Sequence, residues 1–147
     1  MTPADRQSLI RKLGYLQKNL DLLTPYRALS EQELTGTPEK KFAVERLMQT
    51  AIESVIDCSR LLVLIEEWRK MRDERDALIV LAEHAVIADD LCERLQRAKG
   101  FRNVLVHEYV EVDPHLLYVH LQTGIADLQG YARSLAAWLN LPEQGTV

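Results

Sequence analysis

Leucines near the start of the chain recur at alternating steps of four and three, and this spacing constrains the fold more than any other feature. They are Leu9, Leu13, Leu16, Leu20 and Leu23. Such steps return to one side of an α-helix, so the five side chains form a narrow apolar stripe of the kind found in helix pairs and bundles. Thr2 and Pro3 are suited to the N-cap and the first helical position, and we expect the helix to end between residues 24 and 29.

Two more long helices are expected from the same kind of pattern. After a connector over residues 30–37, Thr37 and Pro38 repeat the start signal, and the second helix is predicted to run to about residue 69. Its apolar residues cover more than one side, which indicates a central helix or one that also carries a subunit interface. Asp113 and Pro114 start the last helix, expected to run to about residue 140. Its stripe consists of Leu117, Leu121, Ile125, Leu128, Ala132, Leu135 and Leu139.

The region between these helices is predicted to hold shorter elements. Residues 70–76 are strongly charged and indicate a solvated turn, and residues 77–84 and 88–99 indicate short helices. Gly100 is expected to interrupt, with helix resuming over residues 101–107. No strand alternation appears. We therefore predict an all-α fold, an antiparallel bundle of about five to six helices with two long hairpin arms and short helices, as one domain over residues 1–147 with a polar tail at about 141–147.

Composition narrows the classes of protein. The formal net charge of −4 argues against broad nonspecific nucleic-acid binding, although a local basic cleft remains compatible with it. Cys58 and Cys92 lack CxxC or His spacing, so we expect buried thiols rather than a disulfide or a zinc site. No signal core and no uncharged run near the ~20 residues of a membrane span are present, which favours a cytoplasmic location.

Four chemically versatile side chains gather between residues 102 and 109, namely Arg102, Asn103, His107 and Tyr109. At about 100° per residue, Asn103 and His107 share a helix face, whereas Arg102 and His107 lie about 140° apart. One straight helix therefore does not bring all four together. Either the helix ends near His107 and Tyr109 curls back, or a two-fold-related copy supplies the missing half.

These side-chain types suit cleavage of an RNA phosphodiester. Histidine moves protons near neutral pH, and arginine can hold a phosphate through two parallel hydrogen bonds. Asparagine can orient either group, and tyrosine can donate a hydrogen bond or stack on a base. Because the RNA 2′-hydroxyl is itself the nucleophile, the reaction requires no serine, cysteine, metal or other cofactor, and we expect none here.

The sequence of this segment resembles that of a known family. Arg102, His107 and Tyr109 match the Arg-x4-6-His signature of HEPN domains and its extended form Arg-x4-His-x-Tyr, found in the HepT branch, also called DUF86. The similarity covers residues 42 to 139. It includes Glu45, Arg46, Gln49, Ala51, Ile52, Glu53, Asp57, Gly100, Phe101 and Asn103.

The resemblance implies a function for each motif residue. HEPN ribonucleases are metal-independent homodimers whose Arg–His motifs face each other in a cleft. HepT proteins pair with an MNT-type nucleotidyltransferase, an antitoxin that transfers AMP to the motif tyrosine, within a dimer or a larger hetero-oligomer. By position, Arg102 and His107 are expected to be catalytic, Asn103 and Tyr109 to support them, and Tyr109 to be the modification site. A phosphate on Tyr109 would repel RNA and block the cleft.

Several interpretations stay open from the sequence. Arg97, Lys99 and Arg102 are candidates for the basic groups of a cleft. Acidic residues of the second helix either orient the motif or form an ordinary polar face; these are Glu45, Glu53 and Asp57. Structural roles are expected for a further set, His84, His115, His120, Trp68 and Trp138. The competing functions are a non-catalytic HEPN module for nucleotides or partner proteins, and a structural helical protein whose motif is incidental.

Overall fold

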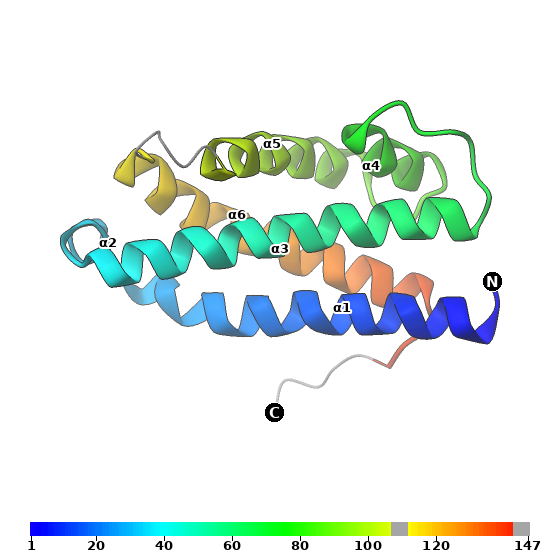
Figure 1. Ribbon diagram of the computed structural model, residues 1–147, viewed down its shortest axis with the longest axis horizontal. Helices are drawn as coiled ribbons and strands as arrows, with labels where there is room; N and C mark the ends of the chain where they lie inside the picture. Colours follow the sequence, from blue (N-terminus) through cyan, green and yellow to red (C-terminus); the bar gives the residue numbers. More distant parts are fainter. Residues whose placement is uncertain (107–111, 143–147) are drawn as a thin grey trace.

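The computed structural model describes residues 1–106 and 112–142, and these residues form an all-helical bundle (Figure 1). The elements are α1 (Pro3–Leu23), a 3-10 turn (Thr24–Ala28), α2 (Glu31–Gly36), α3 (Pro38–Ile65), α4 (Glu74–Glu83), α5 (Asp89–Val106) and α6 (Pro114–Trp138). In Figure 1, α1 and α3 lie side by side in opposite directions, α5 follows the other edge of α3, and α6 crosses behind α3. The predicted fold class is confirmed. None of the described helices has the length and apolar character needed to cross a membrane.

Local capping explains where the first two helices begin. The Thr2 hydroxyl accepts a hydrogen bond from the Asp5 amide at 3.0 Å, and the Asp5 carboxylate accepts one from the Thr2 amide at 2.9 Å. The same capping box joins Ser30 and Glu33, and it starts α2 inside the stretch that we expected to be only a connector. That expectation was wrong because a reciprocal cap satisfies the first amides of even a short helix.

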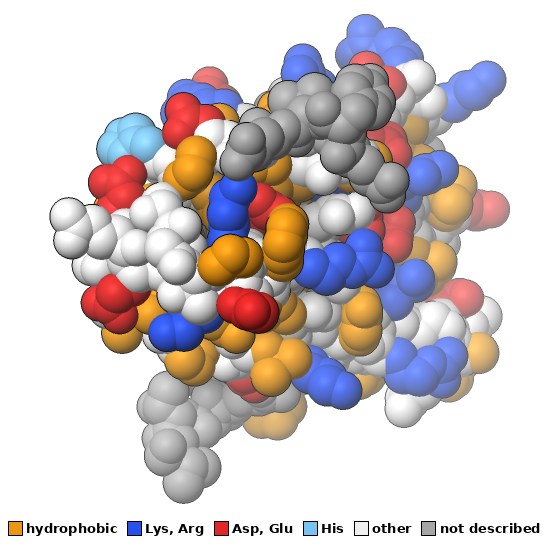
Figure 2. All heavy atoms as spheres, turned by 60° about the vertical axis from the view of Figure 1, so that its left-hand side comes forward, with side chains coloured by type: hydrophobic (Ala, Val, Ile, Leu, Met, Phe, Trp, Pro, Cys, Tyr) orange, Lys and Arg blue, Asp and Glu red, His pale blue; other side chains and the backbone are white. Residues whose placement is uncertain are grey.

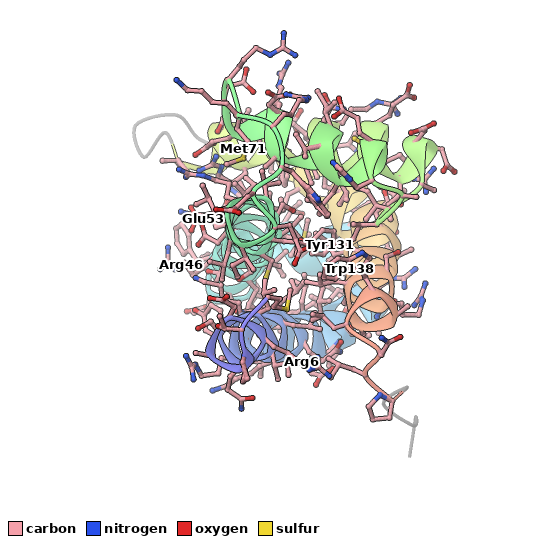
Figure 3. All side chains as sticks on the ribbon, turned by 90° about the vertical axis from the view of Figure 1, so that its right-hand side faces the viewer. Arg6, Arg46, Glu53, Met71, Tyr131 and Trp138 are labelled. Carbon is pink, nitrogen blue, oxygen red and sulfur yellow. The ribbon has the colours of Figure 1, made fainter. Side chains whose placement is uncertain are left out.

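The leucine stripe of α1 and the apolar stripe of α6 meet α3 in one buried core. Tyr131 of α6 is fully buried there (Figure 3). Its hydroxyl lies 2.8 Å from that of Ser59, which itself donates to the Val55 carbonyl at 2.7 Å, so Tyr131 is the donor to Ser59. Burial raises the pKa of Tyr131 and keeps this donor protonated. This contact links α3 to α6 at one defined position.

Cysteines and tryptophans take the structural roles expected of them. Cys58 and Cys92 are buried free thiols, and burial raises the pKa of Cys58 to about 12. Trp68 stacks on His84 with ring centroids 3.9 Å apart, and it meets Trp138 edge to face at 6.0 Å. These rings close the end of the bundle where α3 and α6 finish.

The predicted interruption at Gly100 was wrong, because α5 continues through it to Val106. A Cβ placed on Gly100 would meet no atom within 4 Å, so no close approach requires a glycine at this point. A lone glycine inside a helix costs only about 1 kcal/mol relative to alanine, which the packed residues around it offset. Arg102 and Asn103 therefore stand near the end of one long helix.

The charged stretch after α3 is a solvated turn only in part, since Asp76 is buried. Its carboxylate accepts two hydrogen bonds from Arg69, both at 2.7 Å, and one from the Arg72 amide at 2.9 Å. Arg69 also donates to the Glu83 carboxylate at 2.9 Å, and Asp73 caps α4. These bonds to Arg69 hold the pKa of Asp76 well below its usual range. The network fixes α4 against the end of α3.

We expect Asp76→Asn to lower the free energy of unfolding by about 2 kcal/mol at pH 7. This loss is smaller than that for a fully buried ion pair, because Arg69 still pairs with Glu83 in the variant and is partly exposed to water. A depressed carboxyl pKa contributes stability above the unfolded value near pH 4 and loses it as the pH falls. Urea titrations between pH 7 and pH 2 should therefore show a weaker acid loss in Asp76→Asn. Asp21→Asn, on the exposed side of α1, is the control. An equal loss of the free energy of unfolding between pH 7 and pH 2 in wild type and Asp76→Asn would contradict this role of Asp76.

Candidate functional site

Arg102 lies where three helices converge. It sits near the end of α5, and its side chain is only 15% exposed. Its Nη2 donates to the Glu74 carboxylate at 2.6 Å, and its Nη1 lies 3.9 Å from the Glu53 carboxylate. Glu74 is the first residue of α4, and Glu53 is in the middle of α3. Both ends of the guanidinium are therefore held by other helices, which limits the rotamers open to Arg102.

The charges in this cluster are balanced. Lys99, one turn before Arg102, approaches the Glu74 carboxylate at 3.7 Å, so two cations face two carboxylates. The Nε–H of Arg102 is buried and has no acceptor within residues 1–106 and 112–142. A buried donor without an acceptor costs about 1–3 kcal/mol, so the cluster carries one unsatisfied polar group. An arginine fixed in this way can present the remaining N–H groups of its fork to a phosphate.

Of the other three motif residues, only Asn103 lies within the described residues. Asn103 is exposed on α5, next to Arg102. His107 and Tyr109 fall within residues 107–111, outside the described residues, so both arrangements expected for them remain predictions. α5 carries Arg102 and Asn103 in the two turns before its last described residue, Val106.

The structure gives different contacts to the three acidic residues of α3 whose roles the sequence left open. Glu53 accepts a hydrogen bond from Gln49 at 3.1 Å and faces Arg102, as an orienting residue would. Glu45 pairs with Lys41 one turn away at 3.6 Å and belongs to the polar side of its own helix. Asp57 is exposed and lines a groove between α1 and α3. Figure 3 shows Glu53 and Arg46 on the same outer side of α3.

Sequence reasoning missed Glu74, the strongest partner of Arg102. It lies in the charged stretch that we expected to be a turn, although Asp73 followed by an acidic first turn is a start signal for a helix. Among the predicted basic groups, Lys99 joins the cluster, whereas Arg97 is exposed on α5.

The described histidines have packing or surface roles. His120 stacks on Phe101 with ring centroids 3.9 Å apart, and burial lowers the pKa of His120, so it is neutral at pH 7. His115 Nδ1 lies 2.5 Å from the Glu31 carboxylate at the end of the bundle where α2 meets α6. In the part of the chain that the structure describes, no three His, Cys, Asp or Glu side chains are placed to hold a metal ion.

The end of the bundle near the motif exposes four large apolar side chains. These are Val104 and Val106 of α5 and Leu116 and Val119 of α6, each at least 37% exposed. Figure 2 shows hydrophobic side chains next to arginine or lysine side chains on this end of the molecule. Such a mixed surface is typical of a site that a partner covers.

Comparisons with known proteins agree on one family. The family described as "Ribonuclease HepT-like" matches residues 16–135. A tRNA nuclease HepT of Aphanizomenon flos-aquae is 23% identical over 139 residues, which are 95% of each chain. A protein of Archaeoglobus fulgidus described as an RNase is 34% identical over 109 residues, 74% of this chain and 80% of that one. A tri-AMPylated HEPN toxin of Shewanella oneidensis, solved in complex with MNT antitoxin, superimposes with a TM-score of 0.78 at 19% identity, over 88% of this chain and 96% of that one.

The helical bundle and the partly buried Arg102 near the end of α5 define a HEPN-type protein. Within that class, the chain belongs to the HepT-like ribonuclease family. The resemblance read from residues 102–109 is confirmed at the level of the family.

We expect Glu74→Ala to release Arg102 without unfolding the bundle. The variant removes the carboxylate that lies 2.6 Å from Nη2, so exchange of the Arg102 Nη2 hydrogens with solvent, followed by NMR, should rise about tenfold. Because Glu74 is 40% exposed, the free energy of unfolding should fall by less than about 1 kcal/mol. Glu93→Ala, on the exposed side of α5, should change neither quantity. Equal exchange rates in Glu74→Ala and wild type would show that Glu74 does not hold Arg102.

Proposed function

We propose that this chain is the toxin component of a type II HEPN/MNT toxin–antitoxin system and acts in the cytoplasm as a metal-independent endoribonuclease. Membership of the HepT-like ribonuclease family supports the class of enzyme. The observation that carries the assignment of the site is the guanidinium of Arg102, held by Glu74 and Glu53 five residues before His107.

The reaction is an internal displacement at phosphorus. His107, as general base or general acid, takes the proton of the RNA 2′-hydroxyl or gives a proton to the departing 5′-oxygen. The 2′-oxygen forms a new bond to phosphorus, and the bond from phosphorus to the 5′-oxygen breaks. Arg102 donates hydrogen bonds to the non-bridging oxygens, and Asn103 orients the phosphate or His107.

Glu74 and Glu53 give this site an electrostatic preference. A phosphate that approaches Arg102 competes with two carboxylates that already share the guanidinium. The phosphoryl oxygens carry more negative charge in the transition state than in the resting diester. The transition state therefore competes better with the two carboxylates for the Arg102 guanidinium. The cluster therefore favours the transition state over the ground state, which is the requirement for catalysis.

The proposed unit is a homodimer, alone or within a larger hetero-oligomer with the antitoxin. Arg102 and His107 are about 140° apart on an ideal helix, so a second copy offers a way to complete the site. Exposed Val104, Val106, Leu116 and Val119 supply apolar surface beside the motif for such contacts.

Control is proposed to act through Tyr109. The Tyr109 hydroxyl loses its proton and attacks the α-phosphate of a nucleoside triphosphate bound to the partner nucleotidyltransferase, and pyrophosphate leaves. The resulting AMP places a negative phosphate two residues from His107, where it repels an RNA phosphate and fills the cleft.

We expect His107→Ala and Arg102→Ala to abolish RNA cleavage in the presence of EDTA and to relieve growth inhibition, while the helical signal in circular dichroism stays unchanged. His84→Ala, far from the end of α5, should retain both activities. Full cleavage by His107→Ala would contradict the proposed mechanism. Tight nucleotide binding by wild type without any cleavage would instead favour the non-catalytic module.

For the switch, we expect protein produced together with its antitoxin to gain the mass of one or more AMP groups on the peptide that contains Tyr109. Intact and peptide mass spectrometry measure this increment. Tyr109→Phe should remain unmodified because it lacks the accepting oxygen. An increment confined to another residue, or none at all, would rule out this form of control.

A further inference from the structure

A second polar surface lies on the far side of Glu53 from Arg102. It is a groove of about 490 Å³ between α1 and α3. Arg11, Lys12 and Tyr15 line it from α1, and Arg46 and Asp57 line it from α3, together with Glu53. The groove and the Arg102 cluster therefore share one side chain, Glu53.

The groove gathers three cations of an acidic chain. Arg69, Arg94 and Arg102 are each held by carboxylates. Arg46 and Lys12, by contrast, form no ion pair with any described residue, and Arg11 donates only to the hydroxyl of Ser8, at 3.2 Å. Three cations against two carboxylates give the groove a net positive charge, whereas the whole chain has a net charge of −4. A groove of net positive charge on an acidic protein favours an anionic ligand.

An exposed aromatic ring accompanies these cations. Tyr15 is 55% exposed although it belongs to the helix whose leucines build the core. Exposed aromatic rings beside arginines are the usual platform for unpaired bases, because every base can stack on them. The carboxylates of Glu53 and Asp57 can accept hydrogen bonds from exocyclic amino groups of such bases.

The spacing suits a strand that also reaches Arg102. Arg46 precedes Glu53 by seven residues, or about 10 Å along α3. In Figure 3 both side chains extend from the outer side of α3, between α1 on one side and the α4–α5 pair on the other. A chain of nucleotides whose phosphate contacts Arg102 can thus cross α3 and enter the groove.

We infer that the α1–α3 groove binds single-stranded RNA that flanks the cleavage site, with Arg11 and Arg46 on its phosphates and Tyr15 stacked on a base. This inference rests on the proposed function, because it assigns the scissile phosphate to Arg102. It defines the substrate as RNA that is unpaired on at least one side of the cleaved bond. A duplex would not expose base faces to Tyr15.

The test measures binding of a single-stranded RNA oligonucleotide by fluorescence anisotropy, with all variants in a His107→Ala background so that the RNA stays intact. Arg46→Ala should reduce the slope of log affinity against log salt by about 0.7, and Arg11→Ala with Arg46→Ala by about 1.4. Tyr15→Ala should weaken binding about tenfold with little change in that slope, since it removes stacking and no charge. Binding of the matching duplex should change less in every variant.

Arg133→Ala is the matched control, because Arg133 is an exposed arginine on α6 and does not line the groove. Equal slopes and affinities for the Arg46 and Tyr15 variants and the control would overturn the inference, as would equal losses for single strand and duplex. A lower mass of the groove variants in light scattering would assign the groove to contacts between copies of the chain and also overturn it. Wild type that binds RNA through the groove but never cleaves it would contradict the proposed function alone.

Discussion

The ion pair between Arg69 and the buried carboxylate of Asp76 is the interaction on which the candidate site depends. It joins the segment after α3 to the first turn of α4 through two bonds of 2.7 Å. That turn begins with Glu74, the residue that holds Arg102. A charge pair with one buried member thus sets the position of a carboxylate two residues away, and through it the direction of the motif arginine. A contact remote from the reacting groups can therefore control the geometry of the chemistry.

Local patterns were sufficient to predict most of the helices. The leucine steps of α1, the start signals Thr2–Pro3 and Asp113–Pro114, and the stripe of α6 depend on neighbours within a few residues, so the sequence displays them directly. The family could also be identified, because the spacing of Arg102, His107 and Tyr109 is a local property.

The partners of Arg102 could not be predicted in the same way. Glu74 is 28 residues from Arg102, and a run of charged residues gives no indication of which carboxylate will be buried. The residues next to Asp76 in the sequence are as strongly charged as those around an exposed aspartate. Only its position opposite Arg69 in the folded chain makes its burial favourable. Glu53 was a candidate together with Glu45 and Asp57, since all three fit the polar side of one helix. The packing of α5 against α3 selects Glu53.

Gly100 lowers the intrinsic helix stability of the last turns of α5. A glycine within a helix weakens the hydrogen-bonded turns that include it by about 1 kcal/mol relative to alanine. The turns that carry Arg102 and Asn103 therefore depend on tertiary contacts, such as buried Phe101 stacked on His120 and Arg102 bonded to Glu74. The last described turns of α5 thus owe their order to the helices packed against them more than to the helix itself.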